Sequence, residues 1–91
     1  MHGKLMVLGI LKEIGEPGHR VGIVTSRRVG NAVARNRVRR RLREVIRAAR
    51  PRLISGLWLV VVAKAHSASA PLAALAEEWT QLARRGSILR D

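Results

Sequence analysis

The chain has 91 residues, carries 18 Lys and Arg against 6 Asp and Glu, and has no cysteine. This length allows one domain, residues 1–91, and the lack of cysteine excludes a disulfide framework, a thiolate nucleophile and a cysteine-ligated zinc site. A formal net charge of +12 on so short a chain favours a polyanionic partner. Most of the cations are arginine, which favours nucleic acid over an anionic membrane or an acidic protein. The longest apolar run is too short to span a bilayer, and we expect a soluble, cytoplasmic protein with no membrane partner.

Two segments near the N-terminus are predicted to be strands. Residues 4–12 are rich in Leu, Met, Val and Ile, and residues 20–26 alternate between two faces, as strands of a half-buried sheet do. The cluster Gly15-Glu16-Pro17-Gly18 between them is typical of a turn. We therefore predict an antiparallel hairpin in which these two strands pair directly.

A long helix is predicted from residue 31 to residue 50. Asn31 is a favourable N-cap residue and Pro51 ends the pattern. The apolar residues of this segment recur at helical spacing and fall within one arc of roughly 120°, which is typical of a helix that packs a single stripe on a sheet. These stripe residues are Ala34, Val38, Leu42, Val45, Ile46 and Ala49.

The second half of the chain predicts a further strand and a further helix. Residues 57–63 are apolar and β-branched and follow Gly56, which indicates a strand that is central in the sheet or covered on both faces. Ser69 and Pro71 mark the start of a helix that ends at Gly86, and we expect the last five residues to be frayed. The predicted fold class is α+β, a small sheet with helices packed on it.

Ten arginines and one acid, Glu44, lie between residues 27 and 50. On a helical wheel Arg39, Arg43 and Arg47 project on one flank of the apolar stripe, and further arginines project on the other. Like charges four residues apart destabilise a helix, and a phosphate-rich partner removes this repulsion. The helix is therefore predicted to bind nucleic acid rather than to be only a solvated basic face.

The order of residues in this region is more specific than its charge. The run Ser26-Arg27-Arg28-Val29-Gly30-Asn31 is followed by Arg35-Asn36-Arg37, by the pair Arg39-Arg40 and by Arg43-Glu44. This closely resembles the signature of the bacterial ribonuclease P protein component. That signature has a Ser, two basic residues, Val-Gly, a helix that opens with Arg-Asn-Arg, a basic pair and an Arg-Glu.

The resemblance implies a protein subunit that binds a large catalytic RNA and assists Mg²⁺-dependent removal of the 5′ leader from precursor tRNA. The RNA performs the chemistry and holds most of the Mg²⁺, so we expect no catalytic residue and no bound metal on the protein. The resemblance also implies a mixed sheet with a left-handed strand–helix–strand crossover, and contact with the leader across that sheet. The predicted RNA-binding residues are Arg27, Arg28, Asn31, Arg35, Asn36, Arg37, Arg39, Arg40, Arg43 and Arg47.

The chain departs from the family at its N-terminus. Family members begin with an additional helix, rich in Arg and Phe, before the first strand. Here the first predicted strand starts almost at Met1, and the chain has no Phe and no Tyr. We therefore expect a short form that lacks the N-terminal helix of the family.

Other functions compete with this hypothesis. A structural RNA-binding protein of ribosomal type fits the size and charge equally well. A DNA-binding module needs base-reading side chains in the middle of the helix, and only Asn36 qualifies. For Trp58 and Trp79, stacking on bases is the alternative to packing in the core, and their apolar strand and helix favour the core. Glu77 with Glu78 is predicted to form a solvated helix face.

Overall fold

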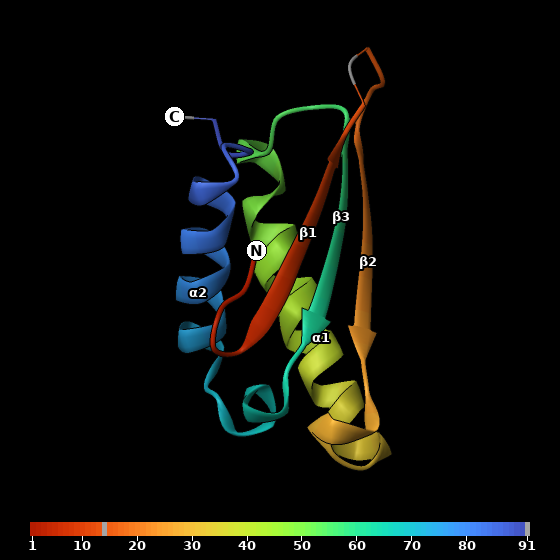
Figure 1. The fold of residues 1–91 in the computed structure, drawn as a ribbon, viewed down its shortest axis with the longest axis vertical. Helices are drawn as coiled ribbons and strands as arrows, with labels where there is room; N and C mark the ends of the chain where they lie inside the picture. The colour runs from red at the N-terminus through yellow and green to blue at the C-terminus, as the bar shows by residue number, and fades with distance from the viewer. Residues whose placement is uncertain (14, 91) are drawn as a thin grey trace.

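The computed structural model describes residues 1–13 and 15–90. Three strands and two long helices follow one another in the predicted order (Figure 1). This confirms the α+β class. The elements are β1 (Met6–Lys12), β2 (His19–Thr25), α1 (Ala32–Ala49), β3 (Leu57–Ala63) and α2 (Leu72–Arg85).

The strand order across the sheet is β1-β3-β2, with β3 antiparallel to β1 and parallel to β2. The predicted direct pairing of the first two strands is therefore wrong. The most apolar strand, β3, lies between them, where it forms ladder hydrogen bonds along both of its edges. The strong turn sequence between β1 and β2 does not decide the pairing.

Gly56 holds the connection between β1 and β2 across the start of β3. The amide of Glu13 donates to the Gly56 carbonyl at 2.7 Å, and the Gly56 amide donates to the Gly18 carbonyl at 3.0 Å. Gly56 has a φ of 73°, and a Cβ there would clash with the Glu13 carbonyl. Only glycine meets both requirements without strain, so this residue determines where β3 enters the sheet.

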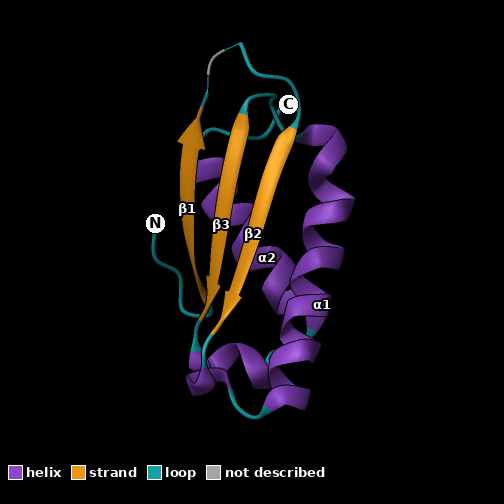
Figure 2. Ribbon diagram, turned by 90° about the vertical axis from the view of Figure 1, so that its right-hand side faces the viewer, coloured by secondary structure: helices purple, strands orange, loops and turns teal. Residues whose placement is uncertain are grey.

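The chain runs from β2 through α1 to the parallel strand β3 with the rare left-handed sense. In Figure 2, β2 and β3 both point downward, both helices lie behind the sheet, and β3 lies to the left of β2. The predicted mixed sheet and left-handed crossover are confirmed.

Both helices cover the same face of the sheet. Leu8 and Leu59 from the strands, Leu42 from α1 and Trp79 from α2 are almost completely buried in one core. No helix of the described residues covers the opposite face, so Val60 of the central strand is exposed. The prediction that β3 is central is confirmed, and the alternative that both its faces are covered is wrong.

The ends of the two helices agree with their sequence signals. The Oδ1 of Asn31 accepts a hydrogen bond from the Ala34 amide at 2.9 Å, as an N-cap does. Gly86 is the C-cap of α2. The frayed end that we predicted is wrong for residues 87–90, because Ile88 is fully buried and Leu89 pairs with Leu53; Asp91 lies outside the described residues. No helix in the described part of the chain is both long and apolar enough to cross a membrane.

Candidate nucleic-acid interface

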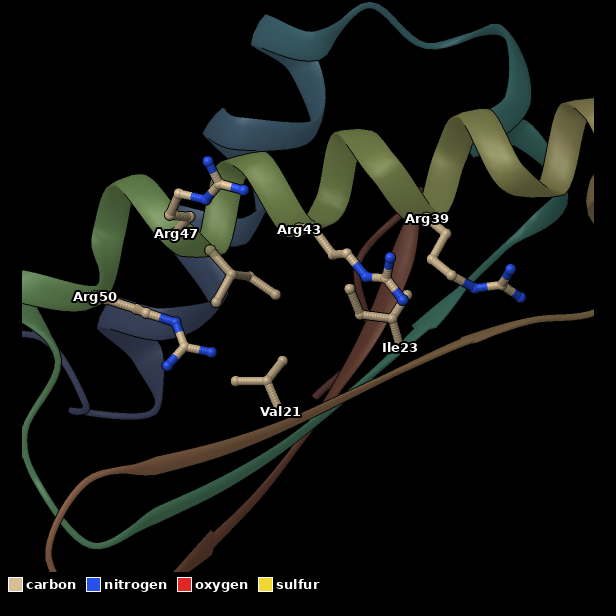
Figure 3. Close-up of a pocket in the computed structure, with 7 residues that line it drawn as sticks. Val21, Ile23, Arg39, Arg43, Arg47 and Arg50 are labelled. Carbon is tan, nitrogen blue, oxygen red and sulfur yellow. The ribbon is translucent and has the colours of Figure 1, made fainter.

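Helix α1 buries one stripe and exposes arginine on both sides of it. Val38, Leu42, Val45 and Ile46 are buried, as the wheel predicted. The helical repeat then places four arginines on the flank of α1 beside β2, and in Figure 3 two of them, Arg43 and Arg50, extend toward apolar side chains of that strand. We call this the α1–β2 groove; it is lined by Val21, Ile23, Ile46, Arg39, Arg43, Arg47 and Arg50.

Arg39 is held in place by two neighbours. Its Nη2 donates to the Thr25 hydroxyl at 2.7 Å and its Nη1 to the Asn36 Oδ1 at 3.1 Å. Thr25 is the last residue of β2, so these bonds link the helix to the end of that strand. A guanidinium fixed in this way loses little side-chain entropy when it meets a phosphate. Asn36 thus positions Arg39, which is itself a predicted RNA contact. Asn36 is also exposed, so its own side chain can reach a ligand.

The loop before α1 presents two further predicted contacts. Arg27 and Arg28 lie in a short 3-10 helix (Arg27–Val29) and are exposed. The Ser26 hydroxyl accepts a hydrogen bond from the Arg28 amide, and Val29 is buried. The loop is therefore anchored on the core while both guanidinium groups face outward. Asn31 follows them in the chain; its Oδ1 caps the helix, and its two amide N–H groups can donate to a ligand.

The remaining predicted RNA-binding residues differ in solvent exposure. Arg37, Arg40, Arg43 and Arg47 are exposed, whereas Arg35 is half-buried. The Nε of Arg35 is buried and has no hydrogen-bond partner among the described residues. All ten predicted residues thus lie on α1 and the loop that leads into it, on both flanks of the buried stripe.

Arg41 has a structural role. Its Nη1 donates to the Ala70 carbonyl at 2.9 Å. Ala70 lies in the short segment between the 3-10 helix Ala65–Ser69 and α2, so this bond ties α1 to the segment that leads into α2. Charge density alone does not separate this arginine from its neighbours on α1.

The outer face of the sheet carries an exposed tryptophan that the sequence analysis assigned to the core. Trp58 is 43% exposed, and the predicted core position is wrong for this residue. The register aligns Leu11, Trp58 and Arg20 in one row across the three strands, and the Arg20 guanidinium lies 5.8 Å from the centre of the Trp58 ring, within range of a cation–π interaction. The outward-facing Arg20 was readable from the alternation of β2, but its meeting with Trp58 depends on the order of the strands.

Glu78 is the second residue whose predicted place was wrong. Its carboxylate accepts hydrogen bonds from the backbone amides of Lys4, Leu5 and Met6, at distances from 2.7 to 3.1 Å. Glu77 is exposed, as predicted. Glu78 therefore fastens the start of β1 to α2, a contact between residues more than seventy positions apart that no local pattern indicates.

The acidic residues do not converge anywhere on the described surface. No group of three or more His, Cys, Asp or Glu side chains in residues 1–13 and 15–90 is placed to hold a metal ion. Trp79, in contrast with Trp58, is 1% exposed and packs in the core as predicted. The exposed arginines of α1 offer hydrogen-bond donors that suit phosphates and planar groups that can stack on bases.

Comparison with known proteins agrees with a nucleic-acid-binding role for the arginine surface of α1. The family model described as Ribonuclease P matches residues 1–86. The chain is 36% identical to the ribonuclease P protein component of Symbiobacterium thermophilum over 84 residues, which are 92% of this chain and 73% of that protein. It is 44% identical to that of Chloroflexus aurantiacus over 71 residues, 77% of this chain and 53% of that protein. The chain thus spans about half to three quarters of the length of these curated relatives.

Solved structures extend the likeness to the fold. The RNase P protein of Staphylococcus aureus superposes with a TM-score of 0.87 at 18% identity, over 99% of this chain and 82% of that one. The RNase P protein of Thermotoga maritima superposes with a TM-score of 0.82 at 25% identity, over 93% and 80% of the two chains. On the sequence matches, the chain belongs to the ribonuclease P protein family.

Proposed function

We propose that this chain is the protein subunit of a ribonuclease P, binding its catalytic RNA in the cytoplasm and assisting removal of the 5′ leader from precursor tRNA. The observation that carries the proposal is the anchored arginine surface of α1, with Arg35, Asn36 and Arg37 in the order that the family signature has. Arg39 is fixed by Asn36 and Thr25, so part of this surface is organised before any RNA arrives.

The protein's part in the reaction is electrostatic and positional. Packing a precursor tRNA against a second large RNA brings phosphates together, and the arginines of α1 reduce that repulsion. Mg²⁺ prefers carboxylate and phosphate oxygens, whereas this surface is cationic and has no carboxylate cluster among the described residues. The protein's residues therefore do not fit a magnesium site, and we assign the ions and the bond-breaking step to the RNA.

The outer face of the sheet is our candidate for the leader contact. A single strand exposes its bases, and an exposed Trp58 beside the Arg20 guanidinium offers a stacking surface with a cation next to it. This face lies away from both helices. The arginine surface and the leader surface are then separate, so one molecule can hold the catalytic RNA and the substrate together.

The test is a reconstitution of the enzyme. The purified chain is mixed with the catalytic RNA of its own source and a precursor tRNA at low Mg²⁺, and 5′ cleavage is compared with that by the RNA alone. We expect the protein to raise the cleavage rate, and Trp58→Leu to weaken binding of substrates that carry a leader without affecting mature tRNA. No gain over RNA alone, together with a pull-down dominated by ribosomal RNA, would support the ribosomal type of function instead.

A further inference from the structure

The α1–β2 groove combines two surfaces that a simple phosphate-binding patch does not need together. Its floor is apolar and is made by Val21, Ile23 and Ile46, and its rim is four guanidinium groups. In Figure 3 the side chain of Arg43 reaches down toward Ile23 and that of Arg50 toward Val21. The arginines therefore border the apolar floor instead of standing away from it.

The rim is cationic without compensation. Among residues 1–13 and 15–90, no acidic side chain lines this groove, and Glu44 lines a different hollow, between α1 and α2. Arg39 is engaged by Thr25 and Asn36. In the part of the chain that the structure describes, Arg43 and Arg50 make no such side-chain hydrogen bond, so their donors are available to a ligand.

The floor limits what that ligand is. A paired RNA backbone presents phosphates and riboses, which match the rim but gain nothing from Val21 and Ile23. An unpaired nucleotide presents both a charged phosphate and a flat, weakly polar base, and guanidinium planes stack on bases. We propose that the α1–β2 groove binds an unpaired nucleotide of the RNA partner, with its base against Val21 and Ile23 and its phosphate between Arg43 and Arg50.

This inference rests on the proposed function, and an acidic peptide laid along the open edge of β2 is the competing occupant. Two observations favour RNA. Arg39 belongs both to the groove and to the family's RNA-contact set, so the groove continues that surface without a break. In addition, all four cations are arginine and none is lysine, which suits phosphate and base recognition better than contact with scattered carboxylates.

The experiment compares three RNA hairpins of one sequence: fully paired, with a single 2-aminopurine bulge, and with an abasic bulge. Dissociation constants are measured by fluorescence anisotropy at one fixed salt concentration. Stacking and burial of one base favour the intact bulge by about tenfold over both other hairpins. The 2-aminopurine emission should change on binding, because its base leaves water for the groove.

Two valines of the same strand provide matched variants. Val21→Thr keeps the shape and the strand preference of the side chain but places a hydroxyl on the groove floor. Val24→Thr makes the same change on the outer face of β2, where Val24 is exposed. We expect Val21→Thr to reduce the preference for the bulge by about threefold and Val24→Thr to leave it unchanged. Arg50→Gln should weaken binding of the bulged hairpin, with Arg85→Gln on α2 as its control.

Equal affinity for the bulged and paired hairpins would overturn the proposal. So would an equal loss in Val21→Thr and Val24→Thr, which would show that the preference does not depend on the groove floor. A loss in Val24→Thr alone would place the base on the outer face of the sheet. A leucine-containing acidic peptide whose binding depends on Val21, when that of the bulged RNA does not, would make the groove a peptide site. A chain that stimulates precursor cleavage but shows no bulge preference loses only this inference, whereas a chain without stimulation loses the proposed function itself.

Discussion

Helices α1 and α2 perform the same packing task with very different surfaces. Both lie on one face of the sheet, and each buries four residues. Outside its buried stripe, α1 carries seven arginines and one glutamate, whereas α2 carries two arginines and two glutamates. The balanced charge of α2 is therefore sufficient for a helix at this place in the fold. The surplus on α1 adds repulsion without adding packing, so its explanation lies in a partner.

The few charged residues of α2 also show that the role of a charged side chain depends on where it lies in the fold. Glu78 is engaged by three backbone amides at the start of β1, while its neighbour Glu77 faces solvent. On α1, Arg41 has a comparable role because it reaches the Ala70 carbonyl, and Arg39 combines such a contact, to Thr25, with its place on the arginine surface. The two helices thus separate charges that hold the fold together from charges that are presented to a ligand, and the following substitutions test that separation.

Trp79→Ala should have the largest effect, and on stability alone. The side chain is almost completely buried between α2 and the sheet, and its removal leaves a cavity that costs about 3–5 kcal/mol. The free energy of unfolding is measured by urea titration. Trp58→Ala is the control, because an exposed tryptophan should cost much less. Equal losses for the two variants would contradict the assignment of the two faces of the sheet.

Glu78→Gln should have the next largest effect. The substitution keeps the shape but replaces a carboxylate by an amide that cannot serve the amides of Lys4, Leu5 and Met6 as well, at a cost of about 1–3 kcal/mol. Glu77→Gln is the matched control and should change the free energy of unfolding by less than about 0.5 kcal/mol. If both variants unfold at the same urea concentration, the link between β1 and α2 contributes nothing.

Asn31→Ala tests the cap that α1 has and α2 lacks. The Oδ1 of Asn31 satisfies the Ala34 amide, whereas Pro71 at the start of α2 provides no side-chain cap. Loss of the cap should cost about 1 kcal/mol of stability. Asn31→Asp keeps the cap and should retain that stability, but its negative charge should weaken RNA binding. Unchanged RNA affinity in Asn31→Asp would remove Asn31 from the predicted contacts.

Arg43→Gln should have the smallest effect on the fold and a selective effect on binding. One exposed charge is lost and no side-chain hydrogen bond among the described residues is broken, so the thermal unfolding temperature should shift little. If Arg43 contacts one phosphate, the slope of log affinity against log salt should fall by about one. Arg85→Gln, an exposed arginine near the end of α2, should leave that slope unchanged. An unaltered slope in Arg43→Gln would show that this side chain faces solvent in the complex.

Local patterns were sufficient for the elements and for the arginine surface. The spacing of Val38, Leu42 and Ile46 determines which side of α1 is buried, and the geometry of a helix then fixes where the arginines point. The Asn31 cap and the start of β3 after Gly56 were also readable, because the signal and the structure it specifies lie within a few residues of each other.

What only the tertiary structure decided is how distant segments meet. The insertion of β3 between β1 and β2 replaced the predicted hairpin, since the competition between strands for the central place is settled by the whole core. The placement of both helices on one face left Trp58 exposed beside Arg20. The same assembly brought Val21 and Ile23 under the arginines of α1 and Glu78 to the start of β1. Each of these contacts joins residues far apart in the chain, so its energy depends on a global arrangement that short-range periodicity does not encode.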